Sequence, residues 1–219
     1  LAYLINAEAP RAMAEACANL NIPLIHISTD YVFDGRGKDP WKSYDKANPK
    51  NAYGRSKLKG EKAIQETSCT YGILRTSWVV SAHGDNFVKT MLNLSRTKNS
   101  LSVVDDQVGG PTCAKDVANA CLIIAKQLID KPQNSGIYHY SGIPDVSWCK
   151  FANAIFKQAG RKTIAKPILT SQYPKLAFRP LNSKLECDLT ETTFSIPRPF
   201  WSNGLNEILE DLGIKDETT

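Results

Sequence analysis

Tyr53 and Lys57 stand four residues apart in the segment Asn51-Ala-Tyr-Gly-Arg-Ser-Lys-Leu-Lys-Gly-Glu61, which has the character of a helix. Residues at positions i and i+4 lie on the same face of a helix. A lysine ammonium beside a phenol favours the phenolate, so we expect Lys57 to lower the pKa of Tyr53 from its reference value of about 10. The pair therefore predicts a general acid that donates a proton near neutral pH.

A group of polar residues, Ser28, Thr29 and Asp30, follows the short apolar segment 22–27. The β-branched residues of this segment predict a buried parallel strand. Ligands of open α/β sheets bind beyond the carboxyl ends of the strands, so the Thr29 hydroxyl is expected to share a substrate oxygen with the Tyr53 phenol. A Tyr-x-x-x-Lys pair also occurs on exposed amphipathic helices, and this context favours the catalytic interpretation over that one.

The elements that position these residues alternate along the chain. We expect helices at 7–20, 51–67, 87–97, 114–128, 147–159 and 203–212, with strands at 22–27, 70–75, 101–104 and 136–141. Residues 34–49 are expected to form a loop over the site, and five prolines after residue 161 predict an irregular lobe. Strand and helix in alternation predict an α/β fold with a parallel sheet and right-handed crossovers.

Composition excludes several classes of protein. The chain has 219 residues, of which 42% are hydrophobic and 22% are charged, as in ordinary globular enzymes. No apolar segment approaches the ~20 residues that span a bilayer, so no membrane partner is expected. The net charge of +5 comes from scattered Lys and Arg residues, so no nucleic-acid partner is expected either. Six dispersed cysteines predict free thiols in the cytoplasm, and no metal site is predicted.

Six segments in this order resemble the dTDP-4-dehydrorhamnose reductases, a family of extended short-chain dehydrogenases/reductases. They are Ile27–Gly35, Tyr53–Glu61, Leu74–Val79, Asn86–Met91, Leu101–Thr112 and Arg179–Ser183. The resemblance extends from residue 1 to about residue 212. It implies a Rossmann-like, doubly wound parallel sheet. Residues 1–142 would be the remainder of an NAD(P)-binding domain, and 143–219 mainly a substrate-binding lobe to which 105–113 contribute.

The activity implied by the resemblance is hydride transfer from NADPH, or NADH, to the 4-keto carbon of dTDP-4-dehydro-β-L-rhamnose. The product, dTDP-L-rhamnose, serves polysaccharide biosynthesis, and the family allows a homodimer. Tyr53 would donate the proton, Lys57 and Ser28 would join it in binding the cofactor, and Thr29 would bond the keto oxygen. The residues that match substrate-binding positions of the family are Thr29, Asp30, Trp78, Gln107, Thr112, Arg179 and Asn182. Each of the last five also has a structural interpretation, as a core aromatic, a turn residue or a tie within the lobe.

Two alternatives remain open at this point. The β subunit of methionine adenosyltransferase resembles these reductases and serves as a non-catalytic partner, and other nucleotide-sugar enzymes of the superfamily carry the same Tyr-x-x-x-Lys pair. The sequence also contains no Gly-x-Gly-x-x-Gly loop for a dinucleotide pyrophosphate. The resemblance implies that on the order of 70 to 80 residues of the first mononucleotide-binding half are missing. We therefore expect the 219 residues alone neither to bind NADPH tightly nor to turn over, and micromolar binding would contradict this.

Overall fold

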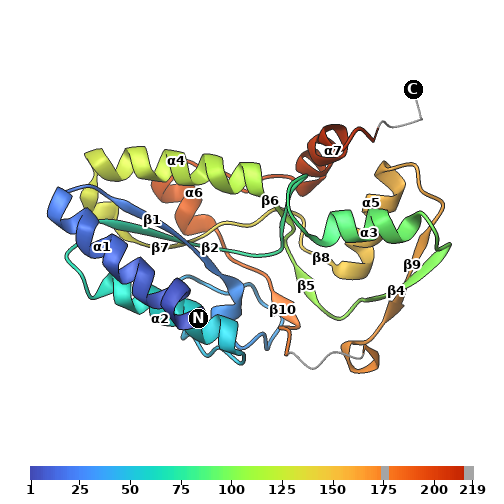
Figure 1. Cartoon of the computed structure of the whole chain (residues 1–219), viewed down its shortest axis with the longest axis horizontal. Helices are drawn as coiled ribbons and strands as arrows, with labels where there is room; N and C mark the ends of the chain where they lie inside the picture. Colours follow the sequence, from blue (N-terminus) through green and yellow to red (C-terminus); the bar gives the residue numbers. More distant parts are fainter. Residues whose placement is uncertain (174–177, 215–219) are drawn as a thin grey trace.

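The structure, a computed structural model, describes residues 1–173 and 178–214 (Figure 1). Its helices are η1 (Leu4–Glu8), α1 (Ala9–Leu20), η2 (Asp30–Val32), α2 (Ala52–Gln65), α3 (Phe87–Ser95), α4 (Ala114–Asp130), η3 (Pro132–Asn134), α5 (Trp148–Gln158), η4 (Thr170–Gln172), α6 (Asp188–Phe194) and α7 (Trp201–Asp211). Its strands are β1 (Leu24–Thr29), β2 (Tyr71–Thr76), β3 (Val79–Val80), β4 (Ser100–Val104), β5 (Val108–Gly109), β6 (Thr112–Cys113), β7 (Gly136–His139), β8 (Val146–Ser147), β9 (Ile164–Ile168) and β10 (Asn182–Ser183).

The first unit is a parallel sheet in the order β1-β2-β7, with α1 and α2 on one face and α4 and α6 on the other (Figure 1). Successive residues of β2 point to opposite faces. Ile73 accordingly packs among Ala14 and Ile64 of the first pair of helices, whereas Leu74 packs against Ile124 of α4. Helices cover both faces of the sheet, and the predicted parallel α/β sheet is confirmed.

The second unit is built around β4, which pairs in parallel with β9, and around α3, α5 and α7. Phe151 and Ile155 of α5 and Leu205 of α7 are fully buried in its core. The helix α5 begins where the sequence predicts, because the Ser147 side chain accepts a hydrogen bond from the Lys150 backbone N–H at 3.1 Å.

Two elements lie where the sequence predicts irregular structure, so that prediction is wrong there. Strand β9 contains Pro167, but it pairs only with β4 in the described part of the sheet, and an edge strand tolerates a residue without an N–H. Helix α6 is rich in threonine and has weak helical propensity. It forms because its Phe194 side chain is buried against Tyr138, with ring centroids 4.7 Å apart.

The chain crosses between the two units several times. Helix α3 and strand β4 precede residue 142 and belong to the second unit, whereas α6 follows residue 143 and packs on β7 and α4 of the first. The linear division at residues 142 and 143 stays a prediction.

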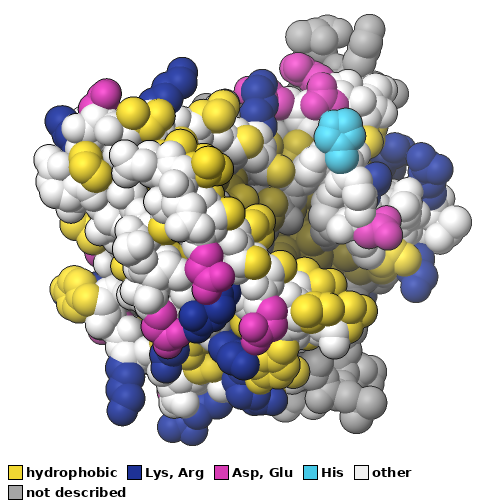
Figure 2. Space-filling view, turned by 60° about the vertical axis from the view of Figure 1, so that its left-hand side comes forward, with side chains coloured by type: hydrophobic (Ala, Val, Ile, Leu, Met, Phe, Trp, Pro, Cys, Tyr) yellow, Lys and Arg dark blue, Asp and Glu magenta, His cyan; other side chains and the backbone are white. Residues whose placement is uncertain are grey.

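The space-filling view shows a hollow in the surface with hydrophobic side chains on its floor (Figure 2). Across residues 1–173 and 178–214, none of the helices has the length and apolar character needed to cross a membrane.

Candidate active site

Strand β1 ends two residues later than the sequence predicts, at Thr29. Pairing with β2 places Ser28 opposite Arg75 and Thr29 opposite Thr76, so both hydroxyl residues belong to the carboxyl end of the strand. The Thr29 hydroxyl accepts from the Tyr31 backbone N–H at 3.2 Å and donates to the carboxylate of Asp30 at 3.1 Å. These contacts start η2 and turn the chain away from the sheet at the edge where ligands bind.

Helix α2 brings Tyr53 to this edge. Its first turn is capped by Asn51, whose side-chain oxygen accepts from the Gly54 N–H at 2.7 Å. A Cβ on Gly54 would lie 2.1 Å from the carbonyl oxygen of Tyr31, so only glycine allows the helix to approach the strand end this closely. The Tyr53 ring meets the Tyr31 ring edge-on at 5.7 Å and remains 49% exposed. The structure therefore brings Tyr53 to Thr29, as predicted.

The predicted direction of the Tyr53 pKa shift is wrong for this structure. Burial raises the pKa of Tyr53, and so does the charge of Asp30, while hydrogen bonding to Thr29 acts in the opposite direction. Lys57 does not lower it, because the ammonium nitrogen donates instead to the carbonyl oxygen of Ile27 at 2.7 Å. Tyr53 therefore keeps its proton at neutral pH, which suits a proton donor.

Lys57 has a second partner that sequence reasoning left without a role. Its Nζ lies 3.1 Å from Nε2 of His26, which belongs to β1. Burial and the neighbouring Lys57 charge lower the pKa of His26 to about 4, so the imidazole is neutral and accepts. Burial lowers the pKa of Lys57, and the negative charge of Glu61 raises it.

Asp30 is a buried carboxyl group with one free oxygen. Burial raises its pKa to about 6, against the opposing effects of the Ser183 and Thr29 hydroxyls. Its Oδ2 is buried and has no hydrogen-bond partner. An unpartnered buried carboxylate oxygen costs free energy. The contact of Asp30 with a sugar hydroxyl stays a prediction.

The raised pKa of Asp30 gives a pH dependence of stability. The pKa of Asp30 lies near 6 in the folded state and near 3.9 in the unfolded state. The carboxyl group therefore makes its full contribution to the free energy of unfolding below pH 3.9, and this contribution is lost as the pH rises through about 6. We expect Asp30→Asn to remove this loss, worth up to about 3 kcal/mol at pH 7. Urea unfolding at pH 4 and pH 7 measures it. If wild type and Asp30→Asn differ in their free energy of unfolding by the same amount at both pH values, the raised pKa of Asp30 is contradicted.

Trp78 lies on the side of the site that faces the second unit. Its indole stacks on that of Trp148 with centroids 3.6 Å apart and planes 10° apart. A Cβ on Gly109 would lie 3.0 Å from the Trp78 ring, so Gly109 also packs closely against this indole. The Trp78 backbone has φ of 50°, a left-handed conformation that costs free energy in a non-glycine residue. Trp148 was missed because an indole at a helix start has no sequence signal of its own.

Gln107 and Arg179 line a small cavity of about 80 Å³ together with Trp148, Phe87 and Met91. The Gln107 side chain is buried and donates to the Thr170 hydroxyl at 3.0 Å. Arg179 lies near enough to Tyr31 for its charge to oppose the rise in the pKa of that phenol. Arg179 therefore lies within reach of Tyr31 and also lines the cavity next to Trp148, and Gln107 lies at the same cavity.

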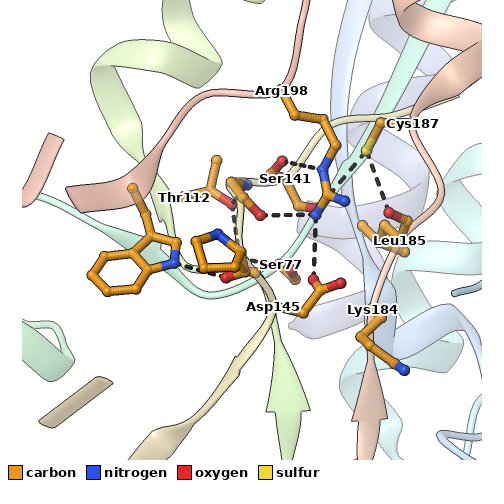
Figure 3. A network of polar contacts seen from close by, with 12 residues as sticks. Ser77, Thr112, Ser141, Asp145, Lys184, Leu185, Cys187 and Arg198 are labelled. Carbon is orange, nitrogen blue, oxygen red and sulfur yellow. Dashed lines mark hydrogen bonds and ion pairs between the residues drawn. The ribbon is translucent and has the colours of Figure 1, made fainter. Parts of the chain in front are cut away.

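Thr112 and Asn182 are buried and already have partners within the chain. The Thr112 hydroxyl donates to the Gly110 carbonyl at 3.0 Å and accepts from the Gly142 N–H at 3.1 Å, within the network around Arg198 (Figure 3). The Asn182 amide donates to the Asp39 carbonyl at 2.8 Å. Both side chains tie loops together, and their contact with substrate stays a prediction.

The residues that fit a nicotinamide cofactor lie at the end of β1 and on α2. The Tyr53 phenol and the Lys57 ammonium are donors that match ribose hydroxyls, and the exposed half of Tyr53 leaves room for a ligand. The Ser28 hydroxyl donates to a carboxylate oxygen of Glu61, so it can only accept from a cofactor. In residues 1–173 and 178–214, no cluster of three or more His, Cys, Asp or Glu side chains could hold a metal ion.

A doubly wound parallel sheet with a Tyr-x-x-x-Lys helix packed at the carboxyl end of its strands defines the short-chain dehydrogenase/reductase class. A family model described as the RmlD substrate binding domain matches residues 1–214. The dTDP-4-dehydrorhamnose reductase of Sinorhizobium fredii is 42% identical over 214 residues, which cover 95% of this chain and 72% of the relative. The chain belongs to the dTDP-4-dehydrorhamnose reductase family.

Solved structures of reductases have the same fold. The dTDP-4-dehydrorhamnose reductase of Clostridium acetobutylicum superposes with a TM-score of 0.88 at 38% identity, covering 96% of this chain and 73% of that chain. The reductase of Bacillus anthracis, solved in complex with NADP, superposes with a TM-score of 0.85 at 36% identity, covering 95% and 73%. The Rossmann-like fold predicted from the sequence is thereby confirmed.

Proposed function

We propose that the protein carrying this chain reduces the 4-keto group of dTDP-4-dehydrorhamnose to give dTDP-L-rhamnose, for polysaccharide biosynthesis. The observation that carries the proposal is the meeting of Thr29, Asp30 and Tyr53 at the carboxyl end of β1, in a chain whose relatives at about 40% identity bear the reductase name. NADPH is the proposed cofactor, since a related reductase was solved with NADP. A reduced nicotinamide supplies the hydride.

Residues of the chain stabilise the negative charge that develops on the keto oxygen. Tyr53 is protonated at neutral pH and donates its proton to that oxygen as the carbonyl is reduced. Thr29 offers a hydroxyl beside the phenol, and its proton has to turn from the Asp30 carboxylate to the keto oxygen. That hydrogen bond strengthens as the oxygen becomes negative and so lowers the barrier. Asp30, with its free Oδ2, accepts from a hydroxyl of the sugar and orients the ring.

The second unit supports binding of the nucleotide portion. Arg179 supplies a cation on the path between Tyr53 and the Trp78–Trp148 stack, and a guanidinium suits a diphosphate. We propose that Gln107, Thr112 and Asn182 shape the same side of the site through the loops that they hold. This arrangement would place the keto group at Tyr53 and the nucleotide toward the second unit.

Loss of reduced-nicotinamide absorbance tests the proposal. We expect the protein that carries this chain to oxidise NADPH when dTDP-4-dehydrorhamnose is added, and not when dTDP-glucose, which has no keto group, replaces it. Oxidation that needs no keto sugar would assign a different substrate. A folded protein that oxidises neither NADPH nor NADH with the keto sugar would favour the alternative of a non-catalytic partner subunit. None of the compared relatives supports that alternative.

Localisation and assembly belong to the proposal as well. We place the enzyme in the cytoplasm, which is consistent with six cysteines that form no disulfide in the structure. A homodimer is proposed from the family resemblance alone. Sedimentation velocity on the protein at micromolar concentration distinguishes a monomer from a dimer.

A further inference from the structure

Glu61 continues the row of side chains that begins with Tyr53 and Lys57. The three residues occupy positions i, i+4 and i+8 of α2, so they lie along one face of the helix, toward β1. Glu61 is completely buried, whereas an unpaired glutamate is almost never found in a core. A buried carboxylate at this position therefore needs partners and invites a functional explanation.

The partners of Glu61 come from the two strands whose ends form the site. Arg75 of β2 donates to both carboxylate oxygens, through Nε at 2.9 Å and a terminal nitrogen at 2.7 Å, and Ser28 of β1 donates to one of them. Arg75 and Ser28 face each other in the sheet register. Three charge-assisted hydrogen bonds thus fix this point of α2 against both strands.

The pair also contacts the loop 34–49, which is predicted to lie over the site. Arg75 donates through its remaining terminal nitrogen to the carbonyl oxygen of Ser43 at 3.1 Å. Its guanidinium lies 5.1 Å from the centre of the Phe33 ring, which stacks on Trp41 at 4.7 Å. Helix α2, the strand ends and the loop 34–49 therefore meet at one buried ion pair.

The charge of Glu61 acts on Lys57. The hydrogen-bond partners of the ammonium are neutral: the Ile27 carbonyl and the His26 imidazole. Burial works against the charged form of Lys57, and Glu61 is the charged group that works in its favour. Tyr53, on the same face, is protonated at neutral pH and contributes no charge there.

We propose that Glu61 is a positioning residue of the reductase site, which holds Lys57 as a half-buried ammonium beside Tyr53 while its carboxylate is fixed by Arg75 and Ser28. Glu61 itself touches neither the cofactor nor the substrate. The inference rests on the proposed function for its consequence in catalysis, but not for its effect on Lys57, which can be measured without ligands.

The direct test is an NMR titration of Lys57 without cofactor or substrate. The Cε signals of 13C-labelled lysine are followed against pH, with Lys57→Arg to assign the signal. We expect Glu61→Gln to lower the pKa of Lys57 by about one pH unit, because one nearby negative charge is lost. Glu61→Asp keeps the charge and should leave the pKa close to that of the wild type. Glu207→Gln, which removes a carboxylate from the exposed pair with Lys115, is the matched control and should change nothing.

A second variant keeps the test decisive if Glu61→Gln does not fold. The double variant Glu61→Gln with Arg75→Met removes both buried charges, so its Lys57 pKa is compared with that of Arg75→Met, and the two proteins differ only at Glu61. We expect the pKa of Lys57 to be lower in the double variant than in Arg75→Met. A Lys57 pKa that does not fall when Glu61→Gln is introduced, whether into the wild type or into Arg75→Met, overturns the proposal.

The pH profile of keto-sugar reduction is the second measurement. We expect the basic limb of kcat to move to lower pH by the same amount in Glu61→Gln, and not in Glu61→Asp. If the NMR shift is found but the protein reduces no keto sugar, the proposed function fails and the effect of Glu61 on Lys57 stands.

Discussion

Tyr53→Phe is expected to lower kcat for keto-sugar reduction by about a thousandfold, because a positioned general acid contributes roughly 10²- to 10⁴-fold. The variant loses only the phenolic hydroxyl and keeps the ring that meets Tyr31 edge-on. Since Tyr53 is half exposed, the free energy of unfolding of the variant should differ little from that of the wild type. KM for the keto sugar should stay within a few-fold, since the hydroxyl acts mainly as negative charge develops on the keto oxygen.

The measurement is a steady-state absorbance assay over a range of keto-sugar concentrations, with urea unfolding of the same preparations. Tyr3→Phe is the matched control, since Tyr3 is 45% exposed at the start of the chain and has no role in the site. A Tyr53→Phe protein that is folded and retains kcat within threefold would remove Tyr53 as the proton donor. The role would then pass to another group near the keto oxygen.

The sheet and the pair Tyr53 and Lys57 could be predicted because they depend on local patterns. Apolar strands covered on both faces, and a helix with its functional residues at i and i+4, are readable from single segments. Helix α6 and strand β9 could not be predicted, because their stability comes from contacts with Tyr138 and with β4, far along the chain. Tertiary burial there overrides weak local propensity.

The partners of the site residues could not be predicted either, because they too depend on contacts between residues far apart in the chain. The sequence suggests that Lys57 acts on Tyr53, but the ammonium turns to the Ile27 carbonyl and to His26 across the packing of α2 on β1. The stack of Trp78 on Trp148 joins residues 70 positions apart. Glu61 could have been suspected, since it lies one helical step beyond Lys57 in a segment otherwise rich in lysine.

Arg75→Met is expected to destabilise the fold by about 3–5 kcal/mol, because it leaves the Glu61 carboxylate buried with only the Ser28 hydroxyl as a partner. The side chains of the pair are 4% and 1% exposed, so water cannot replace the guanidinium. The variant also loses the hydrogen bond to the Ser43 carbonyl, so the loop over the site is released from the strand beneath it.

Urea unfolding at pH 7 measures this loss, and two comparisons separate burial from charge. Lys115→Met breaks the exposed pair with Glu207, whose side chains are 69% and 51% exposed, and should leave the free energy of unfolding almost unchanged. Adding Glu61→Gln to Arg75→Met should restore most of the lost stability, since the carboxylate that lacked a partner is then neutral. If Arg75→Met is as stable as the Lys115 control, water or a rearranged side chain satisfies Glu61, and the buried pair does not hold α2 to the sheet.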